Sequence, residues 1–360
     1  MSRSSLGVLV AAVVLLSLAV SARAGTVPPP DQEGDDTGLH LLREAAAAAR
    51  LQDYTGTRFV TSWGISGASS TLFDVRHTAA GGLFVDDVSP REPGRWVDPG
   101  SLAGGMASPP EGMLRTLAGN YRVVPAGGGV VCGRDSLIVE ALRPDGTRAA
   151  RFWIDELSRL LLRREILDGA GRVAYADTFL DLTLPDPRPV PPATGSAPAE
   201  PPRVPSPSPS PSPPQSLPQS PPGPEELDRL RARGWEFSGS LPGRLRLFSA
   251  SDAARDYLYL GYSDGLSVVS VFIQPGDLDE TRLRGWHAQS LDGHTIWIRD
   301  SVEREAIWAS GGHVYTVLAD APADMVDAAI AALPHEGEPG LWLRMGKGAA
   351  RLLSWINPFE

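Results

Sequence analysis

The stretch Asp135–Leu182 reads DSLIVEALRPDGTRAARFWIDELSRLLLRREILDGAGRVAYADTFLDL and decides the fold of the first half of the chain. Strand-like runs alternate in it with tight turns, which are supplied by Pro144-Asp145-Gly146 and by Asp168-Gly169-Ala170-Gly171. Strands of ordinary length joined by such turns are typical of an antiparallel meander. We therefore predict strands at 135–142, 147–155, 160–167 and 172–182.

One face of this predicted sheet is apolar. Leu160, Leu162 and Ile166 share a face whose only charged member in the run 160–167 is Arg164. The pattern predicts a curved sheet, or open β-barrel, packed under helices. Two interpretations of the face stay open: a core filled by helix and loops, or an apolar cleft for an acyl chain or an apolar peptide segment. The candidate cleft residues are Phe152, Ile154, Leu160, Leu162, Ile166 and Phe179.

The residues before this meander predict one long helix and further strands. A helix capped by Asp36 or Thr37 places Leu42, Ala46 and Ala49 on one face. A strand begins at Tyr54, where the composition changes to YTGTRFVTSW. Further strands are predicted at 71–77, 82–88 and 95–98, and a short helix through Met113, Leu114 and Leu117. The run Gly127–Gly129 is predicted to be a loop, and it lacks the spacing of a dinucleotide site.

A proline-rich stretch divides the chain. Residues 185–224 hold 18 of the 34 prolines and only three large aliphatic residues, Val190, Val204 and Leu217. Such a stretch cannot bury enough apolar surface to offset its ordering entropy, and each proline lacks a backbone donor. We predict a disordered, polyproline-like linker between two domains, at 38–184 and 225–336. A ligand for an aromatic-groove domain is the alternative.

The second domain is predicted to be a small α+β unit. A hairpin across Ser263-Asp264-Gly265 joins strands at 256–262 and 265–274. Further strands are predicted at 294–300, 304–310 and 314–318. A last helix opens at Asp320 or Pro322, and its inward residues are Met325, Ala329, Ile330 and Leu333.

The amino end predicts export. Arg3, the uncharged run 6–20 and Ala22-Arg23-Ala24 have the pattern of a signal peptide over residues 1–24. The apolar run of 15 residues is shorter than the ~20 residues that span a bilayer, although an uncleaved anchor helix is the alternative. We expect the mature chain in the periplasm or on the extracytoplasmic face of the plasma membrane.

The carboxyl end, residues 340–360, has a cationic amphipathic pattern. The candidate membrane or partner residues of this tail are Trp342, Arg344, Lys347, Arg351 and Trp355. Arginine and lysine bracketed by tryptophan suit a membrane surface or an anionic partner. The alternative is a helix that packs back on the second domain.

Charge and chemistry exclude several classes of protein. Removal of residues 1–24 leaves 31 basic against 43 acidic residues, a net charge of −12, which argues against a nucleic-acid partner. Cys132 is the only cysteine, so no internal disulfide forms. The six histidines show no metal-ligand spacing, and no SxxK motif occurs. The one GxSxG match, at residues 261–265, lies across the predicted hairpin turn and not at the strand-to-helix elbow that such a nucleophile needs. We therefore predict no catalytic residue, no metal site and no cofactor.

The segments YTGTRFV at 54–60, Val131–Asp155 and Leu157–Leu182 together resemble the MucB/RseB family. The second half, with its GW, SDGLS, VFIQP and HTIWIRD segments and a closing helix, resembles the small carboxyl-terminal domain of that family. The resemblance implies an open β-barrel similar to lipoprotein carriers. It also implies a non-enzymatic regulator of an envelope-stress sigma factor, which binds the exported part of a membrane anti-sigma factor.

Within this resemblance, release of the partner follows capture of a lipid-like or lipoprotein signal. The long proline-rich linker and the added tail depart from the better-known members. A carrier of lipids or lipoproteins across the envelope, built on the same apolar cleft, is the second hypothesis. A surface interaction module on a proline stalk is a third.

Limited proteolysis tests the predicted linker. We expect two stable fragments, split between Leu184 and Glu225, because an unpacked stretch is cut before folded domains are. Mass spectrometry of a time course of digestion measures the cut sites. A single resistant body would contradict the linker interpretation.

Overall fold

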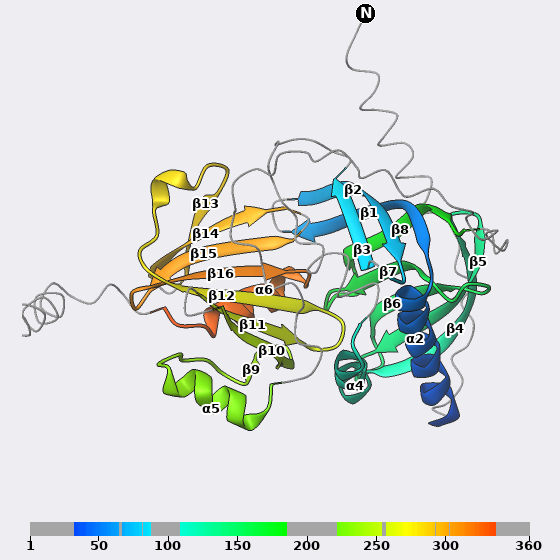
Figure 1. Cartoon of the computed structure of the whole chain (residues 1–360), viewed down its shortest axis with the longest axis horizontal. Coiled ribbons are helices and arrows are strands. Elements are labelled where there is room, and N and C mark those ends of the chain that lie inside the picture. Colours follow the sequence, from blue (N-terminus) through cyan, green and yellow to red (C-terminus); the bar gives the residue numbers. More distant parts are fainter. Residues whose placement is uncertain are drawn as a thin grey trace, which may run out of the picture. The chain divides into compact units, whose positions relative to one another are not determined.

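Two antiparallel sheets make up most of the chain that the computed structural model describes, and each has eight strands (Figure 1). The described residues are 32–64, 67–80, 82–87, 109–185, 222–253, 257–291, 293–301 and 303–335. Both sheets belong to one compact unit of the chain. The predicted α+β class, a large curved sheet covered by helices and a second sheet domain, is confirmed. The domain boundaries given above stay predictions.

The first sheet has the order β3-β2-β1-β8-β7-β6-β5-β4. Its strands are β1 (Tyr54–Gly64), β2 (Gly67–Thr78), β3 (Gly82–Asp87), β4 (Arg122–Val131), β5 (Arg134–Leu142), β6 (Arg148–Asp155), β7 (Leu161–Leu167) and β8 (Val173–Thr183). Strands β4 to β8 form the predicted meander, and β8 then pairs with β1. The meander follows from its turns, because Gly146 and Gly171 both adopt the positive φ that their tight turns require.

Two helices pack on the first sheet, α2 (Gln32–Leu51) and α4 (Glu111–Asn120). The predicted inward face of α2 is confirmed, since Leu42, Ala46 and Ala49 are buried. The helix begins at Gln32, four or more residues before its predicted start. Pro110 precedes the first turn of α4, and its fixed φ suits that position.

The prediction of a loop at Gly127–Gly129 is wrong. These residues lie within the edge strand β4, where the register shifts between Pro125 and Gly128. Gly127 has φ +100°, which a bulge requires. A Cβ atom on Gly129 would lie 3.2 Å from the indole nitrogen of Trp153. The glycines therefore serve a bulged edge strand that passes close to Trp153. The strand predicted at 95–98 lies outside the described residues.

The second sheet has the order β13-β14-β15-β16-β12-β11-β10-β9. Its strands are β9 (Ser240–Leu241), β10 (Leu245–Ala253), β11 (Tyr257–Ser263), β12 (Val268–Pro275), β13 (His287–Leu291), β14 (His294–Asp300), β15 (Arg304–Ser310) and β16 (His313–Ala319). The helices of this half are α5 (Pro224–Ala232), the short 3-10 helix η2 (Glu280–Arg282) and α6 (Ala323–Ala331). The predicted strands at 294–300 and 304–310 are confirmed.

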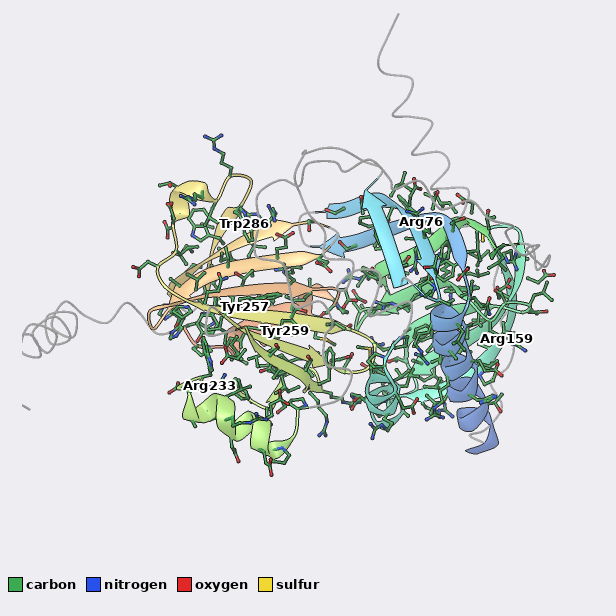
Figure 2. The ribbon with its side chains drawn as sticks, viewed as in Figure 1. Arg76, Arg159, Arg233, Tyr257, Tyr259 and Trp286 are labelled. Atoms are coloured by element: carbon green, nitrogen blue, oxygen red, sulfur yellow. The ribbon has the colours of Figure 1, made fainter. Side chains whose placement is uncertain are left out.

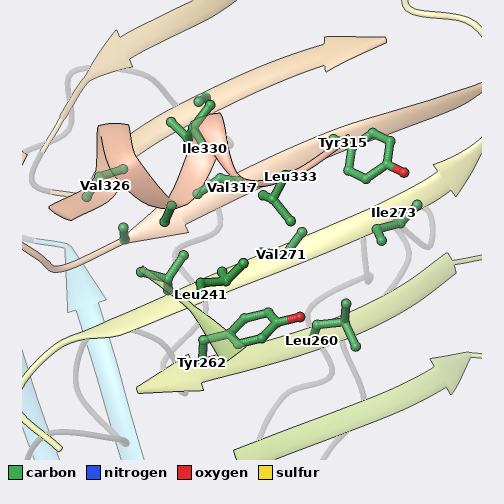
Figure 3. Packing of buried hydrophobic residues seen from close by; sticks show 14 of the residues in the cluster. Leu241, Leu260, Tyr262, Val271, Ile273, Tyr315, Val317, Val326, Ile330 and Leu333 are labelled. Carbon is green, nitrogen blue, oxygen red and sulfur yellow. The ribbon is translucent and has the colours of Figure 1, made fainter. Parts of the chain in front are cut away.

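Helix α6 closes the core of the second sheet (Figure 3). Val326 and Ile330 of the helix pack with Val271 and Val317 of the central strands. Of the predicted inward residues, Ala329, Ile330 and Leu333 are buried, and Met325 is partly buried against the same cluster. The pattern missed β9, β10 and β13. Four of the five residues of β13 are exposed, so this edge strand lacks the alternation that marks a half-buried one.

Substitution of Leu162 tests the core of the first sheet. Its side chain is 0% exposed, whereas that of Leu157 in the β6–β7 turn is 90% exposed. We expect Leu162→Ala to lower the free energy of unfolding by about 2–5 kcal/mol. The control Leu157→Ala should change it by less than about 0.5 kcal/mol. Urea denaturation followed by tryptophan fluorescence measures both, and equal effects would show that Leu162 is not a core residue.

Candidate functional site

The face of the first sheet that α2 and α4 cover holds all six candidate cleft residues. Direct cross-strand partners share a face, and Phe152 lies opposite Arg164, which in turn lies opposite Asp177. We call the side that carries these three residues the helix-covered face. The candidate residues come from β6, β7 and β8 and from the position before β7, and they are Phe152, Ile154, Leu160, Leu162, Ile166 and Phe179.

These six side chains are between 0 and 7% exposed. Phe152 and Ile154 pack with α2 and α4, and the other four pack with residues of β1 and β2. The structure thus brings them together as packed core of one face. Their role in binding a ligand stays a prediction.

A small cavity remains between the helices and this face. Its volume is about 30 Å³, and Leu42, Met113, Phe152, Arg164 and Leu266 are among its lining residues. Small-molecule sites have volumes of roughly 300–1,000 Å³, and a single water needs about 10–15 Å³. In this arrangement the cavity has room for water but not for an acyl chain.

Arg164, the one charge noted on the apolar run, is buried and paired. Its Nη2 lies 3.1 Å from Oδ2 of Asp320, and both side chains are at most 3% exposed. Its guanidinium also lies 4.9 Å from the ring centroid of Tyr175. Asp320 lies between β16 and α6, and its Oδ1 accepts a hydrogen bond of 2.6 Å from the Val268 amide. The charge of one sheet is therefore neutralised by a carboxylate of the other.

A second buried ion pair lies on the same face. Arg58 Nη2 is 2.6 Å from Asp177 Oδ2, and the guanidinium stacks 4.8 Å from the ring centroid of Phe179. Tyr175 lies near both pairs, and burial followed by the Asp177 carboxylate raises the pKa of its phenol well above the usual range. The face thus carries a buried row of charges, which is Arg58, Asp177 and Arg164 together with Asp320 of the second half, and the uncharged phenol of Tyr175 lies near all four.

The sequence analysis singled out Arg164 alone from this row. Alternation along the strands could have identified Arg58 and Asp177 as residues of the same face. Arg58 shares its side of β1 with Val60, and Asp177 shares its side of β8 with Tyr175 and Phe179. Asp320 gave no such signal, since it lies outside any strand.

The turn between β11 and β12, residues 263–267, also contacts the helix-covered side of the first sheet. The Tyr121 hydroxyl donates a hydrogen bond of 2.5 Å to Oδ2 of Asp264, and Asn120 Nδ2 donates to the Asp264 carbonyl at 2.9 Å. Burial and the Asp264 carboxylate raise the pKa of the Tyr121 phenol above its usual range. Leu266 is buried with Leu117 and Phe152 in one apolar cluster. We call residues 263–267 the docking turn.

The second sheet carries an aromatic group on the side away from its core. Tyr257 and Tyr259 lie on β11 (Figure 2), and the Phe272 ring of β12 lies 6.0 and 5.2 Å from theirs. Tyr259 is buried and its hydroxyl lies 3.4 Å from Ser270 Oγ. The three rings therefore pack against one another within the sheet, and their position needs no bound ligand to explain it.

Several predicted features lie outside the described residues. They are the signal peptide at 1–24, most of the linker at 185–224, and the tail with Trp342, Arg344, Lys347, Arg351 and Trp355. Within the described ranges, no three His, Cys, Asp or Glu side chains come close enough together to hold a metal ion. None of the helices in those ranges is both long and apolar enough to cross a membrane.

The fold and the site define a class of protein. It is an α+β protein of two antiparallel sheets, the first of which has a helix-covered apolar face with a buried row of charges. Residues 86–200 match a family model described as the MucB/RseB N-terminal domain. The resemblance that the residues of the first half predict is thereby confirmed.

Solved structures resemble the chain at low identity. The crystal structure of MucB has 19% identity and a TM-score of 0.43, over 82% of this chain and 97% of that one. The complex structure of Pseudomonas aeruginosa MucA/MucB has 17% identity and a TM-score of 0.39, over 84% and 100%. A LolA superfamily protein from Nitrosomonas europaea has 11% identity and a TM-score of 0.21, over 41% and 94%. No curated protein matches the sequence.

The buried ion pair between the sheets generates a prediction about pH. Burial raises the pKa of the Asp320 carboxyl to about 6, against the opposing effects of the Arg164 guanidinium and the Val268 amide. Because the pKa is higher in the folded than in the unfolded chain, the contribution of Asp320 to stability is fully present below about pH 4 and is lost as the pH rises through about 6. Wild type should therefore gain stability relative to Asp320→Asn as the pH falls from 7 to 4.

Urea denaturation at several pH values measures this difference. Asp324→Asn, which removes an exposed carboxylate of α6, is the control and should follow wild type. A constant difference between wild type and Asp320→Asn across this range would contradict the prediction.

Proposed function

We propose that this protein is a non-enzymatic, exported regulator that binds the extracytoplasmic part of a membrane anti-sigma factor. The observation that carries the proposal is the match of residues 86–200 to the MucB/RseB N-terminal domain. One of the similar solved structures is the crystal structure of MucB in complex with MucA(peri). The signal-peptide pattern at residues 1–24 supports a location in the periplasm or on the extracytoplasmic face of the plasma membrane.

The proposed signal is a lipid-like molecule or a lipoprotein, and the helix-covered face receives it. Apolar side chains from β6, β7 and β8 supply the contact area, with Phe152, Leu162 and Phe179 at its centre. Arg164 supplies a positive charge within this apolar surface. An apolar pocket with a few placed polar groups is the usual form of a small-molecule site.

The tail at residues 340–360 is proposed to contact the membrane surface. Its tryptophans and cations, including Trp342, Lys347 and Trp355, are the residue types that bind at an anionic lipid interface. Such contact would keep the regulator close to a membrane-anchored partner and so raise its effective concentration there.

A carrier of lipids or lipoproteins is the alternative function. It uses the same helix-covered face for cargo, and it differs from the regulator in having no tight protein partner. The two functions therefore differ in the partner that the protein binds in the cell envelope, an anti-sigma factor or a cargo of lipids or lipoproteins. They do not differ in the face that binds the lipid.

A crosslinked pull-down of the tagged mature chain from its native envelope tests the two functions. We expect recovery of a single-span membrane protein with a sigma-binding cytoplasmic part, identified by mass spectrometry. Recovery of acyl lipids or many lipoproteins without such a protein would favour the carrier function over the regulator function.

Deletion of residues 340–360 tests the proposed membrane contact of the tail. The variant should keep the protein partner and lose salt-sensitive binding to vesicles of phosphatidylglycerol and phosphatidylethanolamine.

A further inference from the structure

The docking turn fills the place on the helix-covered face where an apolar ligand would lie. Leu266, which belongs to the second half of the chain, is 3% exposed and packs in the same cluster as Leu42, Leu117 and Phe152. The space left beside it is the cavity of about 30 Å³, which Leu266 itself lines. Removal of this turn would uncover the apolar side chains around the cavity.

Close approach of the turn depends on one glycine. A Cβ atom on Gly265 would lie 2.3 Å from the backbone nitrogen of Leu117, closer than such atoms approach in proteins. Gly265 also has φ +98°, a conformation that other residues rarely adopt. The turn therefore lies directly against the backbone of α4, and any side chain at 265 forces the two apart.

The docking turn keeps its shape through its own hydrogen bonds. Asp264 Oδ1 accepts the amides of Leu266 and Ser267, each at 2.8 Å, and Ser263 Oγ accepts the Gly265 amide at 2.9 Å. Its polar contacts with the first half are few: Asp264 accepts hydrogen bonds from Asn120 and Tyr121. A preformed turn can leave the face as a unit, without the cost of unfolding it.

Arg164 is incompletely satisfied while the turn is docked. It is 1% exposed and lines the cavity, yet its Nε and Nη1 have no hydrogen-bond partner among the described residues. Buried charged donors without acceptors are costly and call for an explanation. An anionic group of a ligand would supply the missing acceptors at the polar end of the apolar cavity.

We infer that the docking turn is an internal plug of the helix-covered face, and that an amphiphile with one anionic group displaces it. The anion lies at Arg164, and the apolar chain takes the place of Leu266. The inference rests on the proposed function, because it assumes that this face receives an apolar signal. Ligand and plug exclude each other, so the ligand binds only the arrangement in which the docking turn has left the face. Binding therefore raises the population of that open arrangement, by an amount set by the ligand's difference in affinity for the two arrangements.

Weakening of the contact between the docking turn and the first half tests the plug. Tyr121→Phe removes the hydrogen bond from the Tyr121 hydroxyl to Asp264 Oδ2. The probe is 11-(dansylamino)undecanoic acid, whose fluorescence reports an apolar environment. We expect this variant to bind the probe more tightly than wild type does, because the docked turn is held less firmly. The control Tyr262→Phe removes a hydrogen bond to the Ser238 carbonyl within the second half and should bind as wild type does.

A second variant opens the plug by steric conflict. Gly265→Ala should tighten binding of the probe by roughly tenfold over wild type, because the added methyl group expels the turn. Gly312→Ala is the matched control: its φ is +80°, but its Cβ would meet nothing within 4 Å, and it should bind as wild type does. Near-ultraviolet circular dichroism checks that each variant is folded.

The charge at Arg164 is tested with a pair of probes. Arg164→Gln should lower the affinity for the carboxylate probe relative to that for its alcohol analogue, whereas Arg164→Lys should keep the ratio of the two affinities close to that of wild type. Equal affinity of wild type, Tyr121→Phe and Gly265→Ala for the probe would overturn the plug and leave the face as a binding site. Absence of binding by every variant, including Gly265→Ala, would overturn the plug and the lipid-sensing part of the proposed function together.

Discussion

A charged side chain on an apolar sheet face must find an opposite charge, and this constraint organises the structure. Arg164 lies on the face that α2 and α4 cover, where it is buried from bulk solvent. Its partner Asp320 comes from the second sheet, so the need to neutralise one guanidinium ties the two halves together. Buried pairs of this kind gain little net stability over apolar packing. Arg164–Asp320 therefore specifies where the halves meet more than it strengthens either of them.

Local pattern predicted the first sheet well, and it failed where a residue's role depends on distant neighbours. Turn residues such as Gly146 and Gly171 set the meander, because their φ values are local properties. The glycines at 127–129 have the composition of a loop, but pairing with β5 makes them part of a strand. The partner of Arg164 follows it by 156 residues, and no spacing rule connects the two. The apolar side chains of the candidate site were therefore predictable, whereas the row of charges and the docking turn were not.

The same buried face can serve as a core and as a receptor, and the docking turn reconciles these interpretations. Leu266 completes the core when the turn is in place, which explains why the candidate cleft residues are buried. At Arg164 this core is not fully satisfied, because Nε and Nη1 have no hydrogen-bond partner among the described residues. If the face receives a ligand as proposed, these donors give its anionic group a contact that the docked arrangement lacks.

The long separation between Arg164 and Asp320 has a consequence for the order in which the chain folds. Strands β1 to β8 are complete by residue 183, so the first sheet can assemble from contacts within its own stretch while Arg164 is still hydrated. The carboxylate that pairs with Arg164 follows β16, so it is in place only once the second sheet has formed. Until then the first sheet has an unpaired guanidinium and lacks Leu266 on its apolar face. A chain in this state is the one most exposed to aggregation and to proteolysis.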